Sequence, residues 1–233
     1  MDFSKHKFFM LQILRDIYSD LELANALGFK GGSALMFFYN LPRFSVDLDF
    51  NLLQSDKEKE TEIYLKLRNI LLKYGKIDDE AQKFFGPILV LNYGKGERKL
   101  KVEISNRKDD SHYEVKTFMG INMLVMTVAD MFAHKLCALL NRSELVNRDI
   151  FDCWFFMENR TPVNTNLIEN RMTMPFSDYL QNCIDTLNNI PDKGLLNGIG
   201  DLIDEKMKNF VRTKLRTEAM ILMRFYKEFP ITQ

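Results

Sequence analysis

The chain has 233 residues, of which 46% are hydrophobic and 27% are charged. These values are typical of a globular protein with enough length for one large domain or two small ones. Lysine plus arginine equals aspartate plus glutamate at 32 each, so the overall charge predicts no polyanion partner, and any nucleic-acid contact must come from a local patch.

The spacing of the cysteines and the polarity of the amino-terminal residues favour a cytoplasmic location. Cys137, Cys153 and Cys183 form an odd set without Cys-x-x-Cys spacing, which argues against a disulfide framework and against a zinc site. Polar residues interrupt the first apolar stretch at Gln12 and Arg15, unlike a signal peptide. No run approaches the roughly 18 apolar residues of a membrane span. We therefore expect a cytoplasmic protein without a membrane partner.

The first elements lead to a glycine turn. Apolar residues at three- and four-residue steps predict a helix over residues 3–27, closed by Gly28. A short extended piece then feeds Gly31-Gly32-Ser33, which opens a helix that ends before Pro42. Glycine allows close approach to the main chain, and a helix start with free N–H groups and a hydroxyl suits a phosphate.

An acidic strand follows this helix. Residues Val46 to Phe50 alternate between apolar and acidic, so in a strand the carboxylates of Asp47 and Asp49 share one face. Two carboxylates on one open face repel each other unless a cation lies between them. Mg²⁺ prefers a few carboxylates plus substrate phosphates, so the pair predicts a site for Mg²⁺, or for Mn²⁺ as an alternative.

Each motif alone has a simpler explanation, because most Asp-x-Asp pairs are solvated strand faces and most Gly-Gly-Ser turns are helix entries. Both within about twenty residues resemble the nucleotidyltransferase superfamily, whose pattern is Gly-Ser, a helix, then Asp-x-Asp. More narrowly, the run Lys30-Gly-Gly-Ser-Ala-Leu35 with Leu41-Pro-Arg-Phe-Ser-x-Asp-Leu-Asp-Phe50 resembles the AbiEii/AbiGii abortive-infection toxin family. The resemblance implies that Gly31, Gly32, Ser33 and Arg43 bind the nucleotide.

A helix and then several strands come next. Ser55-Asp56 is expected to cap a helix over 57–74, and extended segments are expected at 76–85, 87–93, 98–105 and 114–118. Glu103 lies on a strand face otherwise occupied by lysines. It forms either a cross-strand salt bridge or the third carboxylate of a metal site. The family resemblance favours the second role, although many members of the superfamily carry aspartate there.

The second half of the chain is predicted to be helical. Thr127-Val-Ala-Asp130 has the form of a capping box, and the helix it opens carries Lys135 in the middle of its apolar stripe. Such a lysine either snorkels to water or faces a site that supplies negative charge. In the family a lysine on this helix is a recurrent site residue, which implies that Lys135 holds nucleotide phosphates.

The next helix begins at Asn147-Arg-Asp-Ile-Phe-Asp152. Arg148 and Asp152 are spaced for a plain helix ion pair, and Asp149 in the first turn complements the helix dipole. The family pattern Arg-Asp-x-x-Asp implies that Asp149 lines the site, and we interpret Asp152 as structural. Further helices are predicted at 164–170, 176–190 and 203–228. The last carries a row of basic residues, Lys208, Arg212 and Arg216, that is either a solvated face or a track for RNA or an acidic partner.

Together these features predict an α/β (α+β) fold. A nucleotidyltransferase-like mixed sheet flanked by helices occupies residues 1–120, and a helical domain over 121–233 completes the active-site cleft. Asp47, Asp49 and Glu103 would be the metal ligands, and these three with Lys135 and Asp149 the catalytic set. The predicted reaction moves an NMP from an NTP to an acceptor hydroxyl.

The resemblance further implies a bacterial toxin that acts on tRNA or another cellular acceptor, with an antitoxin encoded beside it. Two alternatives differ in function. One is a transferase of the same fold that modifies a small molecule or a protein side chain. The other is an inactive domain that only binds nucleotides. The intact set of motifs argues against the inactive domain but does not identify the acceptor.

Overall fold

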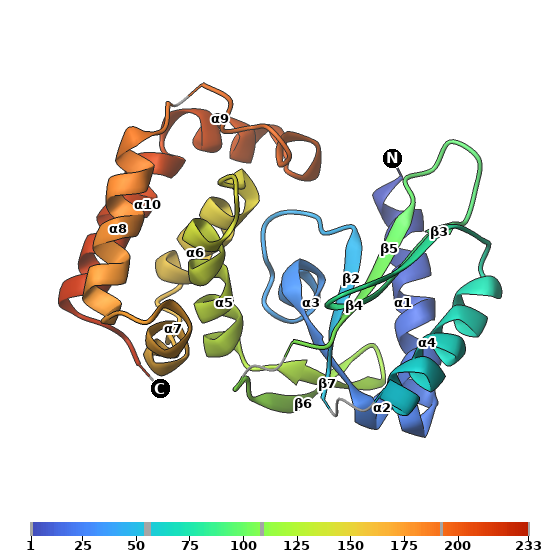
Figure 1. The fold of residues 1–233 in the computed structure, drawn as a ribbon. Helices are drawn as coiled ribbons and strands as arrows, with labels where there is room; N and C mark the ends of the chain where they lie inside the picture. The colour runs from blue at the N-terminus through green and yellow to red at the C-terminus, as the bar shows by residue number, and fades with distance from the viewer. Residues whose placement is uncertain (1, 54–56, 108–109, 192, 233) are drawn as a thin grey trace. The chain divides into compact units, whose positions relative to one another are not determined.

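A computed structural model describes residues 2–53, 57–107, 110–191 and 193–232. The chain divides into two compact units (Figure 1). Unit 1 comprises Met1–Asn40, Phe44–Asp109 and Tyr113–Met126, and unit 2 comprises Leu41–Arg43, Asp110–His112 and Thr127–Gln233. Of the helices described, none is both long and apolar enough to span a lipid bilayer.

The described part of unit 1 contains one mixed sheet of seven strands. The strands are β1 Leu27–Lys30, β2 Asp47–Leu52, β3 Lys76–Lys83, β4 Gly86–Asn92, β5 Leu100–Ser105, β6 Tyr113–Phe118 and β7 Ile121–Met126. Their order in space is β3-β4-β5-β2-β1-β7-β6. Strand β2 is parallel to β5, strand β1 is parallel to β7, and the other neighbours are antiparallel. The predicted α/β class is therefore confirmed.

The two faces of β2 and β5 differ in character. Leu48 and Phe50 on β2 and Val102 and Ile104 on β5 are buried, and α1 Phe3–Ser19 and α4 Lys57–Leu72 lie along one side of the strands (Figure 1). Because successive side chains in a strand alternate between faces, the polar residues between these apolar ones all point to the opposite face. That face carries the candidate site.

The single helix predicted over residues 3–27 is wrong, because the chain forms α1 and then a separate α2, Leu21–Ala26. Asp20 breaks the helix, since its side chain accepts hydrogen bonds from the backbone N–H groups of Glu22 and Leu23 and caps the second helix. Gly28 does not close a helix but lies within β1. A Cβ at this position would lie 2.2 Å from Cε1 of Tyr113, so the close approach of that ring requires glycine.

Helix α3, Gly31–Phe38, follows β1 directly. The predicted cap of α4 at Ser55-Asp56 lies outside the described residues. Strand β7 was missed by the sequence reading, which placed the domain boundary after residue 120. The units instead divide after Met126, because β7 pairs with β6 and β1.

Unit 2 is helical in its described part. It contains α5 Val128–Asn141, α6 Asn147–Glu158, α7 Thr165–Met172, α8 Phe176–Asn189, a 3₁₀ turn at Gly200–Leu202, α9 Glu205–Thr213 and α10 Leu215–Glu228. Aromatic rings join α5 to α6 and α10, with the Phe132 centroid 4.9 Å from Phe156 and 5.7 Å from Tyr226.

Two predictions for unit 2 are wrong. The helix expected over 203–228 is interrupted at Lys214, so the basic row is divided between α9 and α10. Arg216 Nη1 donates to the carbonyl of Ile190 at 3.1 Å. The capping box at Thr127 does not form, because the Asp130 carboxylate accepts from the backbone N–H of His112 and from Asn164 Nδ2 instead.

Candidate active site

The acidic residues predicted from the sequence share the open face of unit 1. Asp47 is paired in register with Lys101, and Asp49 with Glu103, across the parallel strands β2 and β5. Residues paired in this way point to the same side of a sheet. One cluster is therefore formed by three carboxylates and one cation, namely Asp47, Asp49, Glu103 and Lys101.

Lys101 supplies the positive charge of this cluster. Its Nζ lies 3.0 Å from Glu103 Oε2 and 3.7 Å from Asp47 Oδ2. Burial lowers the pKa of Lys101, but Asp47, Asp49 and Glu103 outweigh burial and raise it overall. The lysine is therefore charged at neutral pH and partly neutralises the three carboxylates.

Asp49 is the most constrained of these acids. Burial raises the pKa of Asp49; Lys101 and Lys30 lower it, while Asp47 and Glu103 raise it further. Gly31 packs directly against its carboxylate, because a Cβ on Gly31 would lie 2.7 Å from Asp49 Oδ2. Gly31 also has φ of +78°, a conformation that side chains disfavour. The glycine turn and the acidic strand are thus fitted to each other.

Ser33 has a structural contact within the same motif. Its side chain is fully buried, and its hydroxyl donates a hydrogen bond to the backbone carbonyl of Asp47. At the start of α3, Lys30 is the N-cap and gives no side-chain cap to the first N–H groups. The side chain of Lys30 instead donates to Asn51 Oδ1, and Asn51 Nδ2 donates to Tyr113 Oη at 2.7 Å.

The candidate residues of unit 2 form a second charged cluster. Lys135 on α5 lies 2.9 Å from Asp149 Oδ1 and 2.8 Å from Asp152 Oδ2, both on α6. Arg43 binds Asp152 through two contacts, with Nε 2.6 Å from Oδ1 and Nη2 2.7 Å from Oδ2. Arg142 Nε lies 2.9 Å from Asp149 Oδ2. Three cations therefore surround two buried carboxylates.

The second cluster changes the interpretation of two predicted residues. Lys135 faces carboxylates of its own chain, and these outweigh burial and raise its pKa. Arg43 is only 6% exposed and is directed at Asp152. Burial raises the pKa of Asp152, but Arg43 and Lys135 outweigh it and hold the pKa at about 2. Asp152 is therefore an ionised structural partner, and Arg43 positions it.

Asp149 differs from Asp152 in its hydrogen bonding. Its Oδ2 atom is buried and has no hydrogen-bond partner among the described residues, although Arg142 Nε lies nearby in an ion pair. A carboxylate oxygen in this situation retains unused capacity to accept a hydrogen bond. Asp149 is thus less fully hydrogen-bonded than Asp152.

The residues of unit 1 fit a divalent cation only in part. Asp47 and Asp49 offer hard oxygen atoms on one face, next to a glycine turn too tight for a side chain, and Mg²⁺ needs few protein ligands when phosphates complete its shell. The expected convergence of three carboxylates is not observed. No group of three or more acidic, histidine or cysteine side chains that could hold a metal occurs in the described ranges. Glu103 pairs with Lys101 at 3.0 Å.

Sequence reasoning assigned no role in the site to two residues that shape it. Lys101 is two positions before Glu103 and so shares its face, a signal that was available in the alternation. His6 could not be found in this way. Its ring is fully buried and contacts Tyr93 Oη at 2.6 Å and the carbonyl of Val46 at 2.9 Å, which steadies the start of β2.

Comparison with solved structures identifies proteins of similar fold. Across 96% of this chain and 94% of the other, it is similar to a putative nucleotidyltransferase from Helicobacter pylori, with a TM-score of 0.62 and 18% identity. It is also similar to JHP933 from Helicobacter pylori, with a TM-score of 0.58, 18% identity and coverage of 97% and 92%. A third similar structure is MenT4, a nucleotidyltransferase toxin from Mycobacterium tuberculosis, with a TM-score of 0.61, 17% identity and coverage of 96% and 84%.

The family comparison is more specific than these structural matches. No match is found among curated proteins. A family model described as nucleotidyl transferase AbiEii toxin, type IV toxin–antitoxin system, matches residues 12–219. That span contains the glycine turn, the acidic strand and both charged clusters. The chain therefore belongs to the AbiEii family of nucleotidyl transferase toxins.

Proposed function

We propose that this protein transfers a nucleoside monophosphate from an NTP to an acceptor hydroxyl in a reaction that depends on Mg²⁺ or Mn²⁺. The observation that carries the proposal is the packing of Gly31 against Asp49, with Ser33 bonded to the backbone of Asp47. These contacts fix a helix start beside two carboxylates. A helix start binds phosphate, and the carboxylates favour the cation that accompanies it.

Asp47 and Asp49 would hold the divalent cation, and the backbone N–H groups at Gly32 and Ser33 would bind the departing phosphates. A bound cation of this kind stabilises negative charge on the transferred and departing phosphate oxygens. Lys135, which is already paired with Asp149 and Asp152, would also counter charge on the triphosphate. Asp149, with its unbonded buried oxygen, would orient a donor group of the substrate.

In this reaction the acceptor oxygen forms a bond to the α-phosphorus of the NTP, and the bond from that phosphorus to the β-phosphate bridging oxygen breaks. Pyrophosphate leaves with that electron pair. The acceptor proton passes to Glu103 or to solvent. Glu103 is suited to this role because it lies beside Asp49 and is held by Lys101, and a base must lie within hydrogen-bond reach of the proton it removes.

The family supports the role of a toxin that is neutralised by a cognate antitoxin in the cytoplasm, and we propose an RNA such as tRNA as the acceptor. A transferase with a small-molecule or protein acceptor is the alternative. Labelled NTP, Mg²⁺ and a total-cell extract distinguish them, because the label moves to RNA, to a small molecule or to protein.

The decisive variant is Asp49→Asn, which removes one carboxylate charge and keeps the side-chain shape. Loss of a charge that stabilises the transition state typically lowers the rate about 10²–10³-fold. We expect growth arrest in a bacterial host and label transfer to disappear while circular dichroism is unchanged. Asp201→Asn, at an exposed position of the 3₁₀ turn Gly200–Leu202, is the matched control. Equal toxicity of the folded Asp49→Asn protein would refute nucleotidyl transfer as the cause of toxicity.

A further inference from the structure

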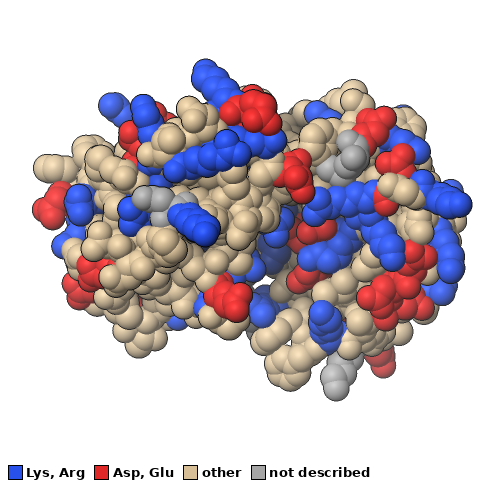
Figure 2. Space-filling view, turned by 90° about the horizontal axis from the view of Figure 1, so that it is seen from above, with Lys and Arg blue, Asp and Glu red and all other residues tan. Residues whose placement is uncertain are grey.

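A hollow of about 440 Å³ lies on the open face of the sheet, beside the carboxylate cluster. Its walls come from β3, β4 and β5, from Phe85 in the turn between β3 and β4, and from Arg107 just beyond β5. They include the carboxylates of Asp79 and Glu103 as well as basic residues. The volume is within the usual range of roughly 300–1,000 Å³ for ligand sites. Figure 2 shows basic side chains gathered around acidic ones over the part of the molecule that carries the sheet. The proposed roles of the nucleotide and metal residues do not use this hollow.

The order of the strands places the hollow opposite the glycine turn. Gly31 follows β1, which borders β2 on one side, whereas β5, β4 and β3 extend from β2 on the other side. Asp47 and Asp49 on β2 therefore stand between the two regions. If the NTP phosphates occupy the glycine side, a second substrate must reach the carboxylates from the side of Glu103. The hollow begins at that residue.

The floor of the hollow combines apolar and charged positions in two rows. Val90 is paired in register with Lys101, and Ile88 with Glu103. Ile88 and Val90 are half-buried, unlike Leu89 on the opposite face, which is fully buried. The apolar strip formed by Ile88 and Val90 leads to the carboxylate of Glu103. Such a surface suits a ligand with a planar ring and a nearby hydroxyl group.

The outer end of the hollow carries an aromatic ring and two cations. The Arg107 guanidinium lies 3.8 Å from the centroid of Phe85, and Lys83 lies nearby on β3. In the described part of the chain neither basic residue pairs with a carboxylate, although the guanidinium of Arg107 stacks on Phe85. Gly86 fixes this end, because its φ is +109° and a Cβ there would lie 2.1 Å from the carbonyl oxygen of Ile104.

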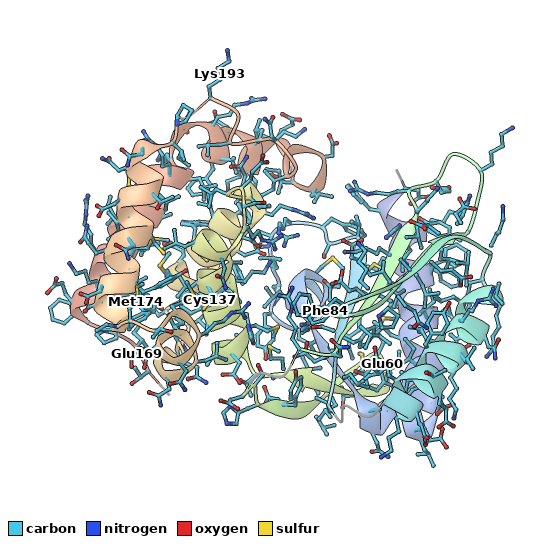
Figure 3. All side chains as sticks on the ribbon, in the orientation of Figure 1. Glu60, Phe84, Cys137, Glu169, Met174 and Lys193 are labelled. Carbon is cyan, nitrogen blue, oxygen red and sulfur yellow. The ribbon has the colours of Figure 1, made fainter. Side chains whose placement is uncertain are left out.

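Phe85 is therefore presented by a tightly determined turn, and its backbone carbonyl accepts a hydrogen bond from the Asn106 N–H at 3.1 Å. Its neighbour Phe84, labelled in Figure 3, is 89% exposed and packs edge-on against it with centroids 4.9 Å apart. Aromatic rings beside unpaired cations are the features that bind single-stranded nucleic acid, since bases stack on the rings and phosphates contact the cations.

We propose that this hollow docks the single-stranded 3′ end of an RNA acceptor. A base stacks on the face of Phe85 that Arg107 does not cover, backbone phosphates contact Lys83 and Arg107, and the terminal ribose hydroxyl lies over Ile88 beside Glu103. This inference rests on the proposed nucleotidyl transfer and adds the residues that select the acceptor. The chain has no net charge, so this local patch has to supply the attraction for a polyanion.

The test measures binding of a 5′-fluorescein RNA dodecamer with a free 3′ hydroxyl, by fluorescence anisotropy in EDTA so that no transfer occurs. Phe85→Ala should weaken binding about 5-fold or more, because stacking is worth ~1–3 kcal/mol per base. Lys83→Ala should reduce the slope of log affinity against log salt by about 0.7, the value for one phosphate contact on a single strand.

The controls are Phe229→Ala and Lys95→Ala, which remove an exposed aromatic and an exposed cation elsewhere. They should bind the RNA as the unmodified protein does, and all four variants should bind a fluorescent NTP analogue equally. Absence of RNA binding, equal affinities for Phe85→Ala and Phe229→Ala, or preference for a DNA dodecamer or a polyglutamate peptide would overturn the proposal.

Transfer assays separate this proposal from the proposed function. If the protein binds RNA through Phe85 but transfers nothing to any acceptor, nucleotidyl transfer is refuted and the docking site stands. If RNA is labelled and Phe85→Ala has an unchanged KM for the acceptor, the transferase function stands and the docking site is refuted.

Discussion

The bidentate contact between Arg43 and Asp152 gives the sharpest prediction about stability. Arg43→Met keeps an aliphatic side chain of similar length but removes the guanidinium from a carboxylate that is fully buried. In this variant Lys135 still lies 2.8 Å from Asp152. Its single charge also pairs with Asp149, so it compensates Asp152 only in part. Breaking a buried pair by removing one partner typically costs about 3–5 kcal/mol, because the other charge stays buried without full compensation.

The pKa of Asp152 gives an independent estimate of this magnitude. Arg43 and Lys135 hold that pKa at about 2, against a value of 3.8 for the free group. The difference corresponds to about 2–3 kcal/mol in favour of the ionised form in the folded protein. Because the pKa is lowered on folding, this stabilisation is present above pH 3.8 and is lost as the pH falls through 2. The electrostatic contribution therefore operates in full at pH 7.

The assay is thermal unfolding at pH 7, followed by circular dichroism. For a chain of this length 1 kcal/mol shifts the midpoint by ~2–4 °C, so Arg43→Met should lower it by roughly 6–20 °C. The matched control is Arg142→Met, since Arg142 also pairs with a buried aspartate but is itself 51% exposed. Exposed pairs contribute about 1 kcal/mol or less. Equal shifts for the two variants would refute the assignment of Arg43 as the structural partner of Asp152.

Three further predictions concern unit 1. Gly31→Ala should unfold at a lower temperature than Gly96→Ala and should lose NTP affinity, because both glycines have positive φ but only at Gly31 would a Cβ meet Asp49; equal effects would contradict the packing. Lys101→Met should bind Mn²⁺ about 5-fold more tightly by calorimetry, since ~1 kcal/mol of repulsion at 4 Å disappears; unchanged affinity would contradict the cluster. Burial lowers the pKa of His6, so the contribution of the neutral ring to the free energy of unfolding should be complete above pH 6.5 and should be lost as the pH falls below that value. His6→Gln should remove this pH dependence of the melting temperature. An unchanged pH dependence in the variant would contradict the role of His6.

The local patterns in the sequence predicted the part of the fold that carries the site. Alternation from Val46 to Phe50 indicated that Asp47 and Asp49 share a face, and the same rule put Glu103 with its neighbouring lysines. These rules depend only on the period of a strand. The family assignment followed from short motifs that lie within the matched span, residues 12–219.

The strand-period rules could not predict ion pairs between side chains that lie far apart in the sequence. The position of Lys135 within an apolar stripe predicted either snorkelling or a ligand, and its actual partners, Asp149 and Asp152, lie on the following helix. Lys135→Ala should therefore lower stability, because the substitution would leave two buried carboxylates with less compensation. Arg43 is more than one hundred residues from Asp152 along the chain, so no local pattern could reveal that pair.

Strand β7 was missed for a related reason. Its sequence, Ile-Asn-Met-Leu-Val-Met, is short and apolar, and such a run does not by its period distinguish a buried strand from the start of a helix. Its pairing with β1 and β6 makes it a strand.

The interruption between α9 and α10 at Lys214 could not be predicted either, because no glycine or proline marks it in the sequence.

Both charged clusters combine carboxylates with basic residues of the same unit, which bears on how the protein could bind its substrates. Without a lysine at 101, Asp47, Asp49 and Glu103 would repel one another and Asp49 would become protonated more readily, since burial already raises its pKa. Lys101 partly offsets this repulsion without any bound cation, and it lowers the pKa of Asp49 against the effect of burial. It is 35% exposed, so in the proposed reaction its flexible side chain would be able to leave Glu103 on binding of a cation with the NTP. Glu103 would then be released beside the hollow at the moment when an acceptor hydroxyl has to lose its proton. On this argument the order of binding matters, and an RNA acceptor bound before the NTP would find Glu103 still engaged by Lys101.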